Sequence, residues 1–231
     1  MLTPFRHGDL GHFQNFWLDS RFHFSFAEYH NPERMGFGPL RVINDDTVRA
    51  GMGFDTHPHR DMEIITYVRK GTILHKDSLG HEGRTGAGDV QVMSAGRGIF
   101  HAEHSDPAED TTLFQIWIHP RERGIAPRWD QKAFPKEPVN ENLNLLVSGR
   151  AEDEGKGALL IHQDAAIYGG RLNAGTALKH PLKSSAYVVL SEGAAQVNGI
   201  ALNAGDGAEV TGEKALDIRA DSDAELLVIE I

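Results

Sequence analysis

Short apolar runs of strand length recur along the whole chain, and this pattern limits the possible folds more than any other feature of the sequence. Gly, Asn, Asp or Pro usually separates the runs, as expected for turns between strands. Few windows carry a helical period with caps. The sequence therefore predicts an all-β protein with many turns. The runs are residues 22–26, 40–43, 64–68, 90–93, 113–118, 187–190 and 225–231.

The two halves of the chain repeat one plan. In the first half, a strand-like run ends at Gly71 and a Gly-Asp turn follows at Gly88. In the second half, a similar run ends at Gly193 and a Gly-Asp turn follows at Gly205. An internal repeat of this kind indicates two similar domains rather than one large one.

The segment 120–144 is rich in Pro, charged and polar residues, a composition typical of a surface connection. A domain boundary is therefore expected near residue 135. We predict an N-terminal domain over residues 1–135 and a C-terminal domain over residues 136–231.

Composition and charge exclude several functional classes. Asp and Glu number 33 against 23 Lys and Arg, so the net charge of -10 would repel nucleic acid and anionic membranes. The sequence shows neither a signal peptide nor an apolar stretch of membrane-spanning length. We therefore expect a cytoplasmic protein that binds neither nucleic acid nor membrane. The chain has no Cys, so a metal ion would have to be held by nitrogen and oxygen atoms.

Two pairs of potential metal ligands occur at strand spacing. His57 and His59 are two residues apart, and so are His101 and Glu103. Side chains at i and i+2 of a strand point to the same face, so two neighbouring strands would bring these four groups together. Three neutral imidazoles and a carboxylate suit Fe(II), Mn, Co, Ni, Cu or Zn.

The other histidines have plainer interpretations. His104 should point outward beside the second pair. His23 lies among Phe22, Phe24 and Phe26, a pattern typical of a buried strand. A surface role is predicted for the histidines in polar or turn-like surroundings, which are His12, His30, His75 and His81.

Residues 57–63 and 93–103, together with 17–20, 24–26 and 40–46, follow a known pattern. On these motifs the chain resembles the cupins, and within them the pirins and the pirin-like bacterial quercetinases. The resemblance covers most of residues 10–130 and becomes thinner in the second half.

This resemblance implies a bicupin fold of two β-barrel (double-stranded β-helix) domains. It also implies one divalent transition-metal ion in the N-terminal barrel, with Fe(II) favoured and Ni, Cu, Co, Mn or Zn as alternatives. The implied ligands are His57, His59, His101 and Glu103.

Glu63 is a second candidate for the carboxylate ligand, because many cupins place a glutamate soon after His-x-His. Those cupins leave four residues in this gap and six more before a glycine, whereas here the gaps are three and seven. This departure favours Glu103 and leaves Glu63 a supporting role. In the second half, the same count back from Gly193 puts Lys179 and Pro181 at the ligand positions, with His180 alone between them. The C-terminal barrel is therefore expected to bind no metal.

Resemblance to the quercetinases implies an enzyme that cleaves the central heterocycle of flavonols with O2 and releases carbon monoxide. Its substrate would be a small phenol or flavonoid, and Glu103 would also serve as the catalytic base. The resemblance to pirins allows an alternative, a non-enzymatic metal or redox sensor that acts through a protein partner. A metal-dependent isomerase or lyase is a third hypothesis, because one fold serves many reactions. A monomer is expected.

Overall fold

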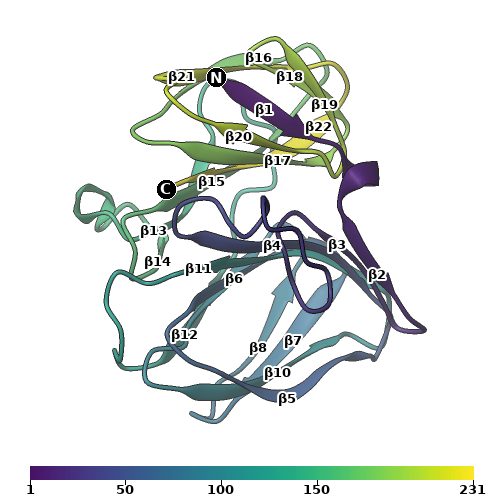
Figure 1. Ribbon diagram of the computed structural model, residues 1–231, viewed down its shortest axis with the longest axis vertical. Coiled ribbons are helices and arrows are strands. Elements are labelled where there is room, and N and C mark those ends of the chain that lie inside the picture. Colours follow the sequence, from purple (N-terminus) through teal and green to yellow (C-terminus); the bar gives the residue numbers. More distant parts are fainter. The chain divides into compact units, whose positions relative to one another are not determined.

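The computed structural model describes residues 1–231, and its regular secondary structure is almost entirely β-strand (Figure 1). The only helices are two three-residue 3-10 helices, η1 (His7–Asp9) and η2 (Ala151–Asp153). The prediction of an all-β protein is confirmed. Neither helix is long and apolar enough to cross a membrane.

The chain forms two compact units. The unit that we call the N-terminal unit consists of Gly11–Phe134 and Leu159–Gln163. The C-terminal unit consists of Met1–Leu10, Pro135–Ala158 and Asp164–Ile231. The first ten residues thus belong to the same unit as the end of the chain.

The N-terminal unit contains two sheets. The larger has the strand order β12-β9-β6-β11-β4-β3-β2, and the smaller has the order β5-β10-β7-β8. Figure 1 shows the smaller sheet facing the larger one. The strands of this unit are β2 (Gly11–Gln14), β3 (Leu18–Phe22), β4 (Leu40–Val48), β5 (Gly53–His59), β6 (Glu63–Lys70), β7 (Thr72–Asp77), β8 (Glu82–Gly86), β9 (Val90–Ser94), β10 (Ile99–Ser105), β11 (Thr111–Ile118), β12 (Arg128–Lys132) and β14 (Leu159–Leu160).

The C-terminal unit repeats this arrangement. One sheet runs β1-β20-β17-β22-β15-β13, and a four-stranded sheet runs β16-β21-β18-β19. In none of these sheets do the two end strands pair with each other. The strands are β1 (Leu2–Phe5), β13 (Asn144–Ser148), β15 (Ala166–Leu172), β16 (Ala177–Pro181), β17 (Ala186–Glu192), β18 (Ala194–Val197), β19 (Ile200–Asn203), β20 (Gly207–Val210), β21 (Ala215–Ala220) and β22 (Ala224–Glu230).

The repeated turns have the same backbone conformation in both units. Gly71 has φ 76° and Gly193 has φ 75°, a left-handed region that side chains other than that of glycine rarely adopt. Gly193 also leaves no room for a Cβ, which would lie 1.9 Å from the carbonyl oxygen of Asp223. The repeat in the sequence therefore corresponds to a repeated turn in the structure.

Two expected elements differ from the structure. The apolar run 22–26 is a strand only at Phe22, the last residue of β3, because the chain then turns and Phe26 bridges to Tyr29. The segment 120–144, expected to be a surface connection, contains strand β12, which pairs along its whole length with β9. Its polar composition suits an edge strand, which has solvent on one side.

Candidate metal centre

Neighbouring strands of the smaller sheet bring the predicted histidines together. His57 and His59 lie on β5 and His101 lies on β10, and the antiparallel register places His101 directly opposite His57. The i, i+2 spacing turns His57 and His59 to the same face of β5. The sheet thus presents three imidazoles from two strands.

The three imidazoles form a compact cluster. One ring nitrogen from each lies within 4.8 Å of those from the other two. The Nε2 atoms of His57 and His101 are 3.1 Å apart. His101 is buried, whereas His57 and His59 are half-buried and border a cavity. Three nitrogen atoms at this separation could bind one metal ion.

The histidines are held in the form that binds metals. His57 donates its Nδ1 proton to the carbonyl oxygen of Asp55 at 2.7 Å, which leaves the lone pair on Nε2. Burial is the main cause that lowers the pKa of His101 to about 3, and the neighbouring His57 and His75 lower it further. Burial is also the main cause that lowers the pKa of His59 to about 4, and His101 and His57 contribute to the shift. At neutral pH His59 and His101 are therefore uncharged and can act as ligands.

Glu103 lies beside this cluster rather than within it. A bulge between His101 and Glu103 shifts the pairing of β10 with β5. The Glu103 carboxylate forms a second trio with His75 and His101, whose ligand atoms also lie within 4.8 Å of one another. His101 therefore belongs to both trios.

Side-chain amides hold the Glu103 carboxylate. Gln91 donates to Oε1 at 2.5 Å and Gln115 donates to Oε2 at 2.8 Å. The hydroxyl of Thr66 lies 3.2 Å from Oε1. These three partners come from β9, β11 and β6 of the larger sheet, so Glu103 of the smaller sheet reaches across the unit.

His75 is the site residue that sequence reasoning missed. The prediction of a surface role is wrong, because His75 is only 3% exposed and lies opposite Glu103 in the register of β7 with β10. Its ring stacks on Trp129 at 4.8 Å, and its Nε2 donates to Asp77 at 3.1 Å. The buried Nδ1 has no hydrogen-bond partner and carries the lone pair. The available signal was the i, i+2 spacing of His75 from Ile73, which puts both side chains on the same face of a strand.

Glu63 lies away from the histidines. On β6, Ile64 lines the cavity and Thr66 contacts Glu103, so the preceding Glu63 points to the opposite face. There its carboxylate accepts a hydrogen bond from Ser94 at 2.7 Å, and burial raises its pKa.

The other histidines considered in the sequence analysis belong to neither trio. His12 and His30 are exposed, as predicted, and His23 is buried, also as predicted. His81 is half-buried and bonds Asp77, so its predicted surface role holds only in part. His104 is partly exposed, 3.3 Å from Asp55. In the C-terminal unit, His180 is buried beside Tyr168, with ring centres 4.5 Å apart.

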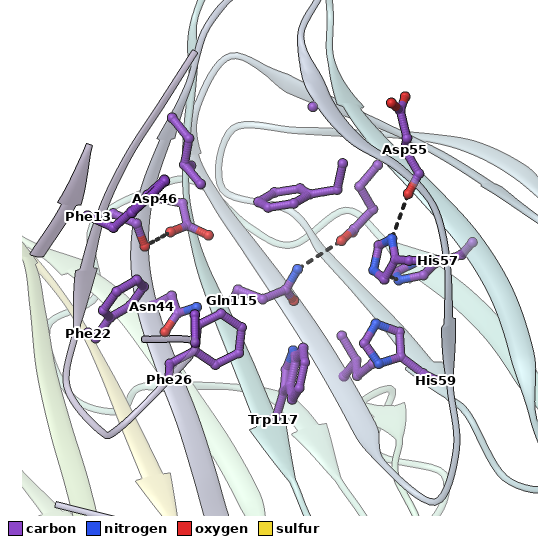
Figure 2. A pocket seen from close by; sticks show the side chains of 18 of the residues that line it. Phe13, Phe22, Phe26, Asn44, Asp46, Asp55, His57, His59, Gln115 and Trp117 are labelled. Atoms are coloured by element: carbon purple, nitrogen blue, oxygen red, sulfur yellow. Dashed lines mark hydrogen bonds between the residues drawn. The ribbon is translucent and has the colours of Figure 1, made fainter. Parts of the chain in front are cut away.

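The imidazoles open onto a cavity of about 550 Å³ inside the N-terminal unit. Its walls are largely aromatic and come from both sheets, as Figure 2 shows. Trp117 packs edge-on against His59 at 4.9 Å and against Phe26 at 5.4 Å. Cavities of this size and apolar character bind small organic molecules.

Comparison with known families gives two matches that together span most of the chain. Residues 7–118 match the Pirin family model, and residues 145–231 match the model described as quercetinase C-terminal cupin domain. Both units thus carry cupin-type sequences.

Individual relatives cover nearly the whole chain. A Pseudomonas aeruginosa protein, provisionally named a quercetin 2,3-dioxygenase, is 50% identical over 96% of this chain and 96% of its own. The quercetin 2,3-dioxygenase of Escherichia coli is 42% identical over 96% of this chain and 94% of its own. The crystal structure of the E. coli bacterial pirin YhhW in complex with nickel(II) superposes with a TM-score of 0.92. That pair is 40% identical, and the match covers 100% of this chain and 99% of the other.

Proposed function

The chain belongs to the pirin family, and from that premise we propose that it is a metal-dependent dioxygenase of the quercetinase type, which cleaves the heterocycle of flavonols such as quercetin with O2. The observation that carries the proposal is the cluster of His57, His59 and His101 at one side of an aromatic cavity. This arrangement offers a metal-binding group and room for a planar phenol in the same space. The names of the relatives support the choice of reaction.

We propose that the cofactor is one divalent transition-metal ion held by His57, His59, His101 and Glu103. The donor set fits such an ion, because it combines neutral imidazoles with one carboxylate and contains no thiolate. Fe(II) is favoured, and Ni, Cu, Co, Mn or Zn are alternatives; the nickel in the E. coli relative shows what that protein accepts. When bound, the metal would supply Lewis-acid activation of a chelating substrate and redox chemistry toward O2.

Glu103 is the proposed catalytic base. Its carboxylate accepts the proton of the flavonol hydroxyl and returns it to the product. Gln91 and Gln115 hold the two oxygens through Nε2 and keep them oriented toward the cavity side of β10. A base contribution of this kind is typically worth about 10²–10⁴-fold in rate.

The aromatic walls position the substrate. Phe22 and Phe26 lie 5.5 Å apart, and Trp117 lies between Phe26 and His59. Flat rings pack well against such side chains and displace water from the cavity, which strengthens polar interactions at the reacting end.

We also propose the finer architecture that the resemblance implies. The two facing sheets of each unit would correspond to one β-barrel (double-stranded β-helix) domain, giving a bicupin. The domain predicted over residues 1–135 would bind the metal and the domain predicted over residues 136–231 would bind none. Their counterparts are the N-terminal and C-terminal units, whose bounds differ from these mainly in residues 1–10 and 159–163.

The two candidate carboxylates can be separated by measuring metal affinity. We expect Glu103→Gln to weaken binding of Ni(II) at least ~10-fold, because it removes a charged ligand. Glu63→Gln should change the affinity less than about twofold, because Glu63 points to the opposite face of β6. Competition with a chromophoric chelator provides the measurement. Equal losses in both variants would contradict the assignment of Glu103.

Turnover tests the proposed reaction directly. Iron-reconstituted protein is incubated aerobically with quercetin while flavonol absorbance and carbon monoxide are followed. We expect oxygen-dependent loss of quercetin with equimolar carbon monoxide, and none in an anaerobic sample or in the His57→Ala, His101→Ala double variant. His104→Ala is the matched control and should retain activity. Bound metal without turnover would overturn the enzyme proposal in favour of a regulatory metal protein.

A further inference from the structure

The cavity has a second polar end, opposite the histidines. Ser20 on β3 and Asn44 and Asp46 on β4 line the cavity, although each is at most 4% exposed. Figure 2 shows Asn44 and Asp46 on one side of the cavity, and His57 and His59 on the other. Polar side chains are rare in an apolar cavity unless they meet a partner there.

The hydrogen-bonding capacity of this polar end is only partly used. The hydroxyl of Ser20 donates to Oδ1 of Asp46. Oδ1 of Asn44 is buried and has no hydrogen-bond partner. Leaving a buried polar atom unpaired costs free energy, so a ligand group that satisfied it would be bound more tightly.

The carboxyl group of Asp46 can donate as well as accept. Burial raises its pKa to about 7, against the opposing effect of the Ser20 hydrogen bond. A neutral carboxylic acid and an amide together offer donors and acceptors at one place. A hydroxyl group, which both donates and accepts, matches this combination.

We propose that Ser20, Asn44 and Asp46 form a second recognition point, which hydrogen-bonds a hydroxyl group on the end of a planar phenol remote from the metal. This inference rests on the proposed function, which places the chelating end of the ligand at the histidines. It narrows the substrate class to elongated phenols with hydroxyl groups at both ends. Phenols with only a chelating group would leave Oδ1 of Asn44 unpaired and would offer Asp46 no further partner.

Binding without turnover tests the recognition point separately from the reaction. Metal-loaded protein under anaerobic conditions is titrated with quercetin, which has remote hydroxyl groups, and with 3-hydroxyflavone, which has only the chelating pair. Quenching of tryptophan fluorescence reports the affinity. The wild-type protein should bind quercetin at least ~10-fold more tightly, within the range for a lost buried hydrogen bond.

Variants of Asp46 and Asn44 test whether these residues cause the preference for quercetin. Asp46→Leu and Asn44→Leu should each reduce the affinity for quercetin about 10-fold or more while changing that for 3-hydroxyflavone little. Asp46→Asn, which keeps a polar group of the same shape, should lose less. Thr47→Val is the matched control, because Thr47 follows Asp46 on β4 and points to the opposite face. A variant that has not folded is identified by its loss of bound metal. If one leucine variant fails in this way, the other tests the recognition point.

An unchanged preference for quercetin in the leucine variants would overturn the recognition point and leave the proposed reaction standing. Failure of wild type to bind either flavonol would also overturn it. A preference for quercetin that is lost in Asp46→Leu, combined with no turnover of quercetin in air, would instead contradict the dioxygenase proposal alone.

Discussion

Replacing His101 by alanine is expected to abolish stable metal binding. His101 is the one residue that belongs to both trios, so its loss removes a nitrogen from each. Loss of a group that merely supports a ligand already costs about 10–100-fold in affinity, so loss of His101 should exceed about 100-fold. Metal content after gel filtration should fall from one equivalent of Ni(II) to below about a tenth.

The control for this prediction lies on the same strand. His104 is three residues further along β10, partly exposed and near Asp55, so His104→Ala should retain a full equivalent of metal. A His101→Ala protein that still eluted with one equivalent would show that the histidine cluster is not the metal centre.

The metal-free Asp46→Asn variant is expected to be more stable than wild type at pH 8. In the folded protein burial raises the pKa of Asp46 from 3.8 to about 7, so between these pH values the folded state holds more protons than the unfolded chain. The stability of wild type therefore falls as pH rises from about 4 to 7, and asparagine removes that loss. The gain should be roughly 4 kcal/mol at pH 8 and less than about 1 kcal/mol at pH 4.

Urea unfolding of both proteins at the two pH values measures this difference. Asp55→Asn is the control, because the Asp55 side chain is fully exposed, and its effect should stay within about 0.5 kcal/mol at both pH values. A gain for Asp46→Asn of the same size at pH 4 and pH 8 would mean that packing, rather than ionisation, is responsible. A more stable variant with weaker quercetin binding is the combination expected of a residue kept for function.

The sequence predicted best what depends on local spacing. The pair His57 and His59 could be placed on one face of a strand from alternation alone, and their partner His101 followed from a second pair of the same kind. The strand-length runs gave the all-β class for the same reason. Whether Glu103 completes the metal site stays a prediction.

Features that depend on register between distant strands could not be predicted. His75 meets Glu103 only because β7 pairs with β10, and nothing in the residues around His75 indicates that pairing. Asn44 and Asp46 look like turn residues in the sequence, yet they lie inside β4 and face a cavity. The signal that could have found them is their i, i+2 spacing from Val42 and Val48, which puts all four side chains on one face of β4.

The amides that hold Glu103 have a consequence for the charge of the centre. Gln91 and Gln115 are neutral donors, so they fix the direction of the carboxylate without cancelling its negative charge. An arginine or lysine in either place would orient Glu103 equally well but would already have neutralised it. Because imidazoles bind metals in their neutral form, a divalent cation bound by Glu103 together with these histidines would leave the centre with a net charge of only +1.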